Sequence, residues 1–312
     1  MILDFVFILL GLGLLGVGGE ALVRGAVGLA LRFNVTPGVI GLTVVAAGTS
    51  MPELVVSVLA AYQGDPDIAV ANVVGSNIFN FGLVLGLTSL VMVIPVTKSN
   101  LRIEWPFLFV ITIGVIFLMA DGYISRLEGT VFLLTAIVFV VIMVMRERGQ
   151  PNDDIDLPDG AATFRRNILI LSGGILMLVL GGDLVVRGAK GLALAWGMSD
   201  RVVGLTIVAM GTSLPELASS LVAAYRGRSD VALGNILGSS IFNLLIILGV
   251  GSILVPLRVS PELYRGDVWW MLAFTWILGP LMFFDKRLTK SHGLILVGIF
   301  VVFMTMVVKS AV

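Results

Sequence analysis

The chain has 312 residues, of which 58% are hydrophobic and 13% are charged, and its mean hydropathy is +1.07. This composition excludes a water-soluble globular protein, which needs far more polar surface, and it predicts an integral membrane protein. A formal net charge of zero without blocks of like charge argues against nucleic-acid binding through bulk charge, and the absence of cysteine excludes thiol chemistry.

Hydropathy predicts ten membrane-spanning helices. In chain order they lie near residues 2–32, 37–62, 67–95, 104–121, 124–145, 166–196, 200–225, 230–256, 267–284 and 291–311. The first is longer than the core of a signal peptide and has no basic leader, so we expect it to be retained as a span. The first and the sixth have roughly 30 residues, or about 45 Å of helix, and must tilt strongly to fit the hydrocarbon core.

One polar segment, 146–165, reads as a soluble linker, because its Asn, Asp, Pro and Gly residues favour turns. It separates a first five-helix repeat, 1–145, from a second, 166–312. The two halves align without a gap at an offset of 163 residues, the difference between positions 216 and 53. Five spans are an odd number, so the second repeat must enter the membrane from the opposite side. The predicted fold is therefore an all-α membrane protein built from inverted repeats, which underlie alternating access in transporters.

Basic residues predict the orientation of the chain. Most lysines and arginines, including Arg146, Arg148, Arg165 and Arg166, fall on the side of the linker. By the positive-inside rule we expect the linker in the cytoplasm and both termini outside.

A short motif occurs once in each repeat. Gly48-Thr49-Ser50-Met51-Pro52-Glu53-Leu54 returns as Gly211-Thr212-Ser213-Leu214-Pro215-Glu216-Leu217. A carboxylate in hydrocarbon costs several kcal/mol and normally faces a cavity, a partner or an ion. The proline is expected to free backbone carbonyls around Ala46 to Gly48, and Thr49 and Glu53 stand four residues apart on one helical face, as do Thr212 and Glu216. The repetition favours function over a protonated, structural carboxyl group.

A second repeated string contains Ser76 and Asn80 in the first half and Ser239 and Asn243 in the second, again four residues apart. Together the motifs offer two carboxylates, two amides, hydroxyls and carbonyls, without thiol or imidazole. Such an all-oxygen set suits Na⁺ and Ca²⁺ and is poor for zinc or copper. The alternative interpretation is that the amides join helices and the hydroxyls bond their own helices.

These motifs resemble those of the cation/calcium exchanger superfamily, in particular the prokaryotic sodium/calcium antiporters, and the resemblance covers both halves. It implies ten helices, of which the long first and sixth slide as a unit, in the plasma membrane of a prokaryote. It also implies a set of ion ligands: Glu53, Glu216, Asn80, Asn243, Thr49, Ser50, Thr212, Ser213, Ser76, Ser239 and the carbonyls of Ala46 and Ala209. Some family members, including the potassium-dependent branch, have aspartate where this chain has Asn243. The absence of that carboxylate here argues against K⁺ co-transport and leaves the stoichiometry open.

The leading hypothesis is thus a secondary antiporter that exchanges Na⁺ for Ca²⁺ across the bilayer, with no cofactor, no nucleic acid and no obligatory protein partner. Proton/calcium exchange is the nearest alternative, because a buried glutamate can carry a proton; the rich hydroxyl set favours Na⁺. A channel needs weak serial sites along an open path, and an enzyme using Ser50 or Ser213 would need a base that neither serine has. The pairs Glu20/Arg24 and Asp183/Arg187 are interpreted as i,i+4 ion pairs, with gating as the alternative.

Overall fold

The computed structural model describes residues 2–148, 164–196 and 209–311, and it is almost entirely helical. Its first half contains α1 (Ile2–Phe33), α2 (Pro37–Ile40), η1 (Gly41–Val45), α3 (Ala46–Thr49), α4 (Met51–Gln63), α5 (Pro66–Phe79), η2 (Asn80–Val84), α6 (Leu85–Val91), β1 (Ile94–Pro95), η3 (Asn100–Glu104), α7 (Trp105–Leu118), η4 (Met119–Asp121), β2 (Tyr123–Ile124) and α8 (Arg126–Glu147).

The second half contains α9 (Phe164–Ala195), α11 (Ala209–Gly211), α12 (Leu214–Tyr225), α13 (Ser229–Phe242), η6 (Asn243–Ile247), α14 (Leu248–Leu254), β3 (Leu257–Arg258), α15 (Pro261–Arg265), α16 (Asp267–Asp285), β4 (Arg287–Leu288) and α17 (Lys290–Ala311). The division at a linker stays a prediction, since residues 149–163 lie outside the described ranges.

Eight of the described helices are long and apolar enough to cross a membrane, and a ninth span results if the bent pair Pro37–Thr49 and Met51–Gln63 counts as one. The predicted count of ten is not confirmed, because the first part of the predicted span 200–225 lies outside the described residues. The predicted boundaries are otherwise close, but two spans start earlier than expected: the one predicted from 104 begins at Asn100, and the one predicted from 267 begins at Pro261.

Local sequence chemistry sets many of the helix ends. Pro66 stands in the first turn of α5, where its missing N–H costs nothing. Gly64 ends α4 with a φ of 99°, a left-handed conformation that favours glycine. Ser125 and Glu128 form a capping box at the start of α8, so that two otherwise unpaired backbone donors are satisfied.

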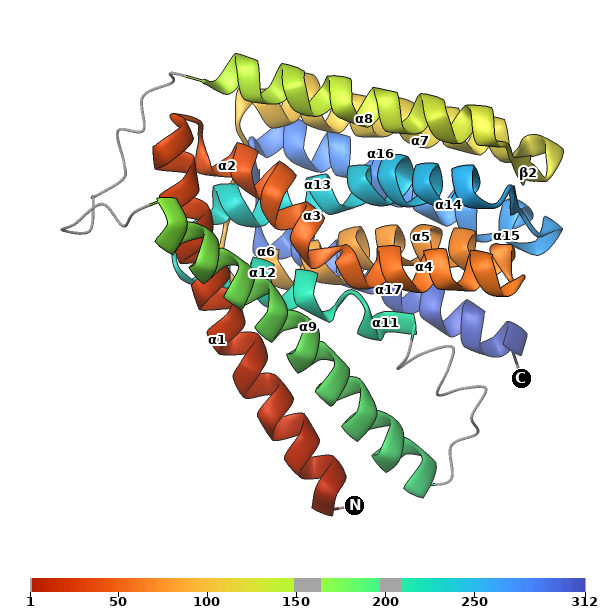
Figure 1. The fold of residues 1–312 in the computed structure, drawn as a ribbon, viewed down its shortest axis with the longest axis horizontal. Helices are drawn as coiled ribbons and strands as arrows, with labels where there is room; N and C mark the ends of the chain where they lie inside the picture. The colour runs from red at the N-terminus through yellow and green to blue at the C-terminus, as the bar shows by residue number, and fades with distance from the viewer. Residues whose placement is uncertain (1, 149–163, 197–208, 312) are drawn as a thin grey trace.

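The two 32-residue helices α1 and α9 lie antiparallel, side by side, and cross the other spans at a steep angle (Figure 1). Glycines allow this close packing: a Cβ atom at Gly11 would lie 2.7 Å from the carbonyl oxygen of Gly181, and one at Gly18 would lie 2.9 Å from that of Gly174. These two contacts are exchanged by the offset of 163, so the pair is built around a local two-fold relation. Strong tilt of the first and sixth spans is consistent with this arrangement.

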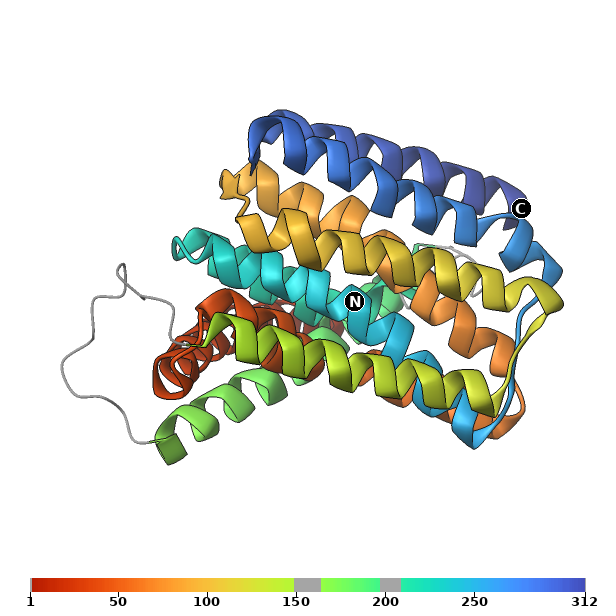
Figure 2. The same cartoon turned by 90° about the horizontal axis from the view of Figure 1, so that it is seen from above.

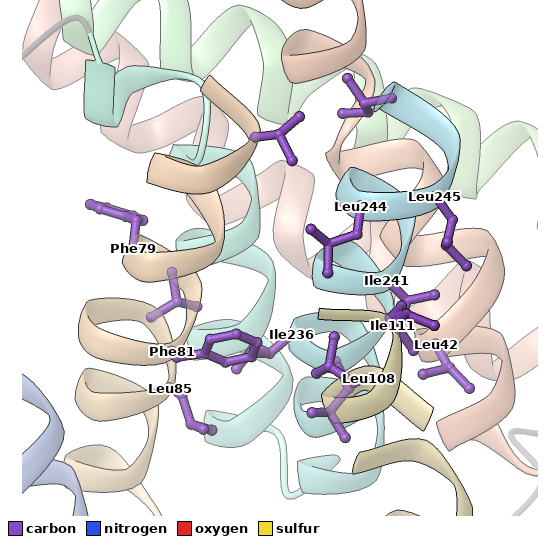
Figure 3. Close-up of a cluster of buried hydrophobic side chains, with 14 of the residues drawn as sticks. Leu42, Phe79, Phe81, Leu85, Leu108, Ile111, Ile236, Ile241, Leu244 and Leu245 are labelled. Carbon is purple, nitrogen blue, oxygen red and sulfur yellow. The ribbon is translucent and has the colours of Figure 1, made fainter. Parts of the chain in front are cut away.

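The remaining spans run alongside one another, and the most deeply buried of them hold the core (Figure 2). In the most apolar stretches of Pro66–Val91 and Ser229–Leu254, 72% and 78% of the residues are buried, against at most 39% in the six other unbroken spans. Figure 3 shows side chains of these central helices, among them Phe81, Ile236 and Leu244, packed together with Leu42 and Leu108. The two central spans are therefore the ones that can hide polar groups from lipid.

Two short antiparallel ribbons join the ends of spans. β1 pairs with β4 through Ile94 and Leu288, and β2 pairs with β3 through Ile124 and Leu257. β1 matches β3 at the offset of 163 and β2 matches β4 at 164, and each half contributes one strand to each ribbon.

Candidate ion-binding site

Both Pro-Glu motifs lie at an interruption of a helix. α3 ends and α4 begins around Ser50, with φ −84° and ψ 9°, and the two parts are bent by 44°. The corresponding Ser213 before α12 has φ −92° and ψ 7°. Pro52 and Pro215 stand in the first turn after each break, where a proline cannot donate to the carbonyl four residues earlier. Each glutamate therefore begins a new helix in the interior of the protein.

The sequence expectation about freed carbonyls is wrong for Ala46. Its carbonyl oxygen keeps the helical hydrogen bond from the Ser50 N–H, at 3.0 Å, and lies 3.4 Å from Thr49 Oγ1. The group four residues before Pro52 is the carbonyl of Gly48, and that is the one that proline deprives of its donor. Ala209 is the first residue of α11, which ends at Gly211. The second break follows, and Ser213 stands directly before α12.

The two glutamates are oriented by serines from the opposite half. Ser213 Oγ donates to Glu53 Oε1 at 2.8 Å, and Ser50 Oγ donates to Glu216 Oε1 at 2.8 Å. All four residues are at most 1% exposed. The bonds are exchanged by the offset of 163, so the two breaks face one another across a local two-fold axis. Repetition in the sequence predicted that these residues belong to one site, and in the structure they are joined by hydrogen bonds.

The second repeated string lies against the same carboxylates. Ser76 Oγ lies 3.3 Å from Ser213 Oγ, and Ser239 Oγ donates to Glu216 Oε1 at 3.5 Å. Thr49 does not bond Glu53; its hydroxyl donates to Asn235 Oδ1 at 3.2 Å and lies 3.5 Å from Ser239 Oγ. Thr49 thus connects the first break to α13 in the other half.

Asn80 and Asn243 each begin a π-helical turn, η2 and η6, in the middle of a span. Such turns are frequent at functional sites because they rotate side chains out of the regular helical register. The η2 turn packs against α12, which carries Glu216, and η6 packs against α4, which carries Glu53. Each asparagine is 1% exposed and lies next to the opposite half's carboxylate helix.

A group of buried oxygens in this region has no hydrogen-bond partner in the described part of the chain. They are Glu53 Oε2, Glu216 Oε2, Asn80 Oδ1, Asn243 Oδ1 and Thr212 Oγ1. A buried acceptor without a donor costs about 1–3 kcal/mol, so proteins rarely gather several at one place. No lysine, arginine or histidine forms an ion pair with either glutamate among the described residues. Oxygens that lack donors and counter-charges suit a cation that carries its own positive charge.

The donor set is all oxygen. Within the described ranges no group of three or more His, Cys, Asp or Glu side chains is arranged to hold a metal ion. Two carboxylates supplemented by neutral amide and hydroxyl oxygens fit hard cations, which take six or more oxygen ligands.

Sequence reasoning missed the residues that support this layer. Asn72 Nδ2 donates to the backbone oxygen of Glu53 at 3.2 Å and to Ser57 Oγ at 3.0 Å. Its counterpart Asn235 donates to Ser219 Oγ at 3.0 Å and Ser220 Oγ at 3.1 Å. Asn72 and Asn235 stand four residues before the serines of the second repeated string, and this duplicated polar residue on an apolar span was the available signal.

The predicted ion pairs on the long helices are confirmed. Arg24 Nε lies 2.6 Å from Glu20 Oε1, and Arg187 Nε lies 2.7 Å from Asp183 Oδ2. Glu20 also pairs with Arg226 at the end of α12, at 2.5 Å, a contact that the sequence did not predict.

Comparison with known proteins decides the family. A family model described as sodium/calcium exchanger protein matches residues 3–145 and 166–309, which is most of the chain. The chain belongs to this family. Its exchangers are transporters, so the protein is a multi-pass membrane antiporter for cations including Ca²⁺, and not an enzyme.

Relatives of this chain match it over nearly their full length. The putative antiporter CaxA of Alkalimonas amylolytica is 39% identical over 96% of this chain and 97% of its own. The sodium/calcium exchanger MaX1 of Methanosarcina acetivorans is 30% identical over 96% of this chain and 97% of its own. A solved structure of the sodium-calcium exchanger NCX_Mj superimposes with a TM-score of 0.85 at 33% identity, covering 98% of this chain and 99% of that one.

Proposed function

We propose that this exchanger moves Ca²⁺ in one direction against Na⁺ in the other, by alternating access to a single site around Glu53 and Glu216. The observation that carries the proposal is the reciprocal pair of serine bonds, which hold one oxygen of each carboxylate and leave the other without a donor. Ca²⁺ and Na⁺ are the cargo, and the transport cycle requires no resident cofactor.

The proposed ligands are those of the repeated motifs. They are Glu53, Glu216, Asn80, Asn243, Thr49, Ser50, Thr212, Ser213, Ser76 and Ser239, with the carbonyls of Ala46 and Ala209. Two ionised glutamates neutralise one Ca²⁺ or two Na⁺, and neutral hydroxyl and amide oxygens serve a desolvated Na⁺ while a proton has no use for them. This is why Na⁺ is favoured over H⁺ as the coupling ion.

We infer that the chain resides in the plasma membrane of a prokaryote, with the 146–165 linker in the cytoplasm and both termini outside. The excess of basic residues on the linker side supports this orientation.

Uptake of ⁴⁵Ca²⁺ into proteoliposomes tests the proposal. An outward Na⁺ gradient at clamped voltage should drive uptake, and an outward H⁺ gradient should not. Uptake driven by H⁺ alone would move the chain to proton coupling, and uptake driven by neither would reject Ca²⁺ exchange with either ion. A second measurement separates an exchanger from a channel: in an exchanger, Ca²⁺ added on the opposite side of the membrane should stimulate the release of ⁴⁵Ca²⁺.

Glutamine variants locate the site in the same assay. Glu53→Gln and Glu216→Gln keep the side-chain volume and remove the charge, so each should abolish uptake in protein that still inserts. Glu104→Gln is the matched control. Glu104 is also buried, with 6% of its surface exposed, but it lies outside the motifs and accepts a 2.8 Å hydrogen bond from Asn100 Nδ2. Normal exchange by either motif variant would reject the site.

A further inference from the structure

Asn77 breaks the repeat at a position next to the ion site. It lies in α5, one turn before Asn80, and is fully buried. The matching residue in the second half, at the offset of 163, is Ser240. The hydroxyl of Ser240 bonds only its own helix in the described part of the chain, donating to the Ile236 carbonyl at 3.0 Å. The two halves therefore treat their asparagines, Asn80 and Asn243, differently.

The Asn77 side chain connects the two halves. Its Oδ1 accepts a hydrogen bond from Asn243 Nδ2 at 3.0 Å. Its Nδ2 donates to the backbone oxygen of Ser240 at 3.4 Å and faces Met271 Sδ at 3.7 Å. One amide thus touches α13, η6 and α16, and none of these atoms is exposed to lipid.

These contacts fix the orientation of two amides in series. The backbone oxygen of Ser240 can only accept, so Asn77 must turn its Nδ2 toward it. Asn77 Oδ1 then faces Asn243, which must donate a hydrogen bond to it from Nδ2. Because an amide is planar, Asn243 Oδ1 points away from Asn77, and this oxygen is one of the buried acceptors that has no donor in the described residues.

The alternative orientation of Asn243 would be harmful to cation binding. With its amide turned over, Asn243 would present two N–H groups where the carbonyl oxygen now lies, and their partial positive charge would repel a cation. Ser240, which matches Asn77 in the second half, makes no such bond to Asn80. The orientation of Asn80 is therefore not fixed in this way.

We propose that Asn77 is a positioning residue for the ion site, which holds Asn243 with Oδ1 directed at the bound Ca²⁺. The inference rests on the proposed function only in taking the cluster of motif oxygens as the place where Ca²⁺ binds. It assigns no direct contact between Asn77 and the ion.

Equilibrium binding of ⁴⁵Ca²⁺ to the purified protein in detergent, without Na⁺, tests this inference. Asn77→Leu keeps the volume and removes both hydrogen bonds, and it should weaken Ca²⁺ binding about tenfold, the range expected for one orienting hydrogen bond to a ligand. Asn243→Ala should weaken binding by at least as much. Since Asn77 acts through Asn243, the double variant should bind no more weakly than Asn243→Ala alone.

The controls separate positioning from packing. Ser240→Ala removes the hydroxyl at the matching position but keeps the backbone carbonyl of residue 240, to which Asn77 donates. The affinity of this variant for Ca²⁺ should be within about twofold of that of the unmodified protein. Asn77→Ala leaves a cavity that Asn77→Leu does not, so a packing role predicts that alanine is worse than leucine for Ca²⁺ binding, whereas positioning predicts equal losses. In uptake assays the loss should fall on KM more than on kcat.

Unchanged binding in Asn77→Leu, or losses that multiply in the double variant, would overturn the inference. If Asn77→Leu does not fold, Asn77→Ser, which copies the residue of the second half, takes its place with the same expected loss. Coupling in the binding assay together with failure of Na⁺ to drive uptake would reject Na⁺ exchange alone, and an original protein that binds no Ca²⁺ would reject both.

Discussion

Each serine of the repeated motif serves the carboxylate of the other half. The bonds from Ser50 to Glu216 and from Ser213 to Glu53 have the same length, 2.8 Å, and link residues far apart in sequence. A donor that fixes one carboxylate oxygen leaves the second oxygen in a defined direction, which is what a ligand for a small cation requires. The two halves therefore build one site, and neither half holds a complete one.

Removing either serine hydroxyl should weaken Ca²⁺ binding to a similar degree. Ser213→Ala leaves Glu53 Oε1 without its donor, and Ser50→Ala leaves Glu216 Oε1 with only the longer bond from Ser239 Oγ, so either carboxylate is free to rotate. A hydrogen bond to a charged group contributes about 1.5–3 kcal/mol, so we expect KM for Ca²⁺ uptake to rise about 10- to 100-fold in each variant.

The control for this experiment is Ser252→Ala. Ser252 is equally buried, but in the described part of the chain its hydroxyl donates only to the Gly249 carbonyl of its own helix, at 3.2 Å. KM should stay near the original value there. A strong effect from one motif serine and none from the other would show that the geometric equivalence of the halves does not extend to binding.

The sequence predicted the glutamates because a repeated carboxylate in an apolar span has few structural explanations. It did not predict Asn77, although that residue stands inside a repeated string, because the two halves differ there and repetition marks only the positions that they share. Nor can spacing show which way an amide faces; that depends on a backbone oxygen of Ser240 that comes from another helix.

At the scale of elements, hydropathy located the described spans well, since a bilayer requires a long apolar stretch wherever a helix crosses it. It could not reveal the π-helical turns at Asn80–Val84 and Asn243–Ile247, because a change of hydrogen-bond register leaves the composition unchanged. The breaks at Ser50 and Ser213 are predictable from proline, and so is the freed carbonyl of Gly48, four residues before Pro52. The expectation extended too far back along the helix, because Ala46 keeps its bond to the Ser50 N–H.

Replacing the prolines at the breaks should slow transport in protein that remains folded. Pro52→Ala and Pro215→Ala restore an N–H that can bond the carbonyl four residues earlier and remove a steric clash, so the helix can continue through the break. Straightening would move Glu53 away from Ser213, or Glu216 away from Ser50. We expect at least a tenfold fall in the rate of Ca²⁺ uptake, and no loss of thermal stability without Ca²⁺.

Pro66→Ala is the matched control, because Pro66 also occupies the first turn of a helix, α5, but follows a loop in place of a break. Its uptake rate should be close to that of the original protein. Full activity in both break variants would mean that the prolines do not maintain the site.

For the whole molecule, the two-fold relation fails where α1 and α9 meet the rest of the protein. A Cβ atom at Gly19 in α1 would lie 3.1 Å from Val222 Cβ in α12, and Glu20 pairs with Arg226 on the same helix. The matching glycine in α9, Gly182, lies nearest to Gly211, Leu214 and Pro215. Its expected partner by the offset, Leu59 in α4, is 51% exposed. Thus α1 packs against α12 of the opposite half and α9 also lies against α12, whereas the equivalent packing of α9 against α4 is not made at Leu59.

This asymmetry is what an alternating-access protein should show in one of its two states, and cross-linking can test it. The chain has no cysteine, so introduced pairs report without background. The Cβ atoms of a Gly19→Cys, Val222→Cys pair start 3.1 Å apart, below the roughly 3.5–4.5 Å of a disulfide, so a small outward shift of one helix should let the pair oxidise. The bond would hold α1 against α12, stop Ca²⁺ uptake, and release it again on reduction.

The pair at the matched positions, Gly182→Cys with Leu59→Cys, provides the decisive comparison. If α1 and α9 slide as a unit, the opposite state brings α9 onto α4 as α1 now lies on α12. This pair should then cross-link slowly, and faster when Na⁺ and Ca²⁺ drive turnover, and the bond should also stop uptake. A pair that never cross-links under any ion condition, while the first pair does, would contradict the exchange of packing between the halves and require a different motion to open the site.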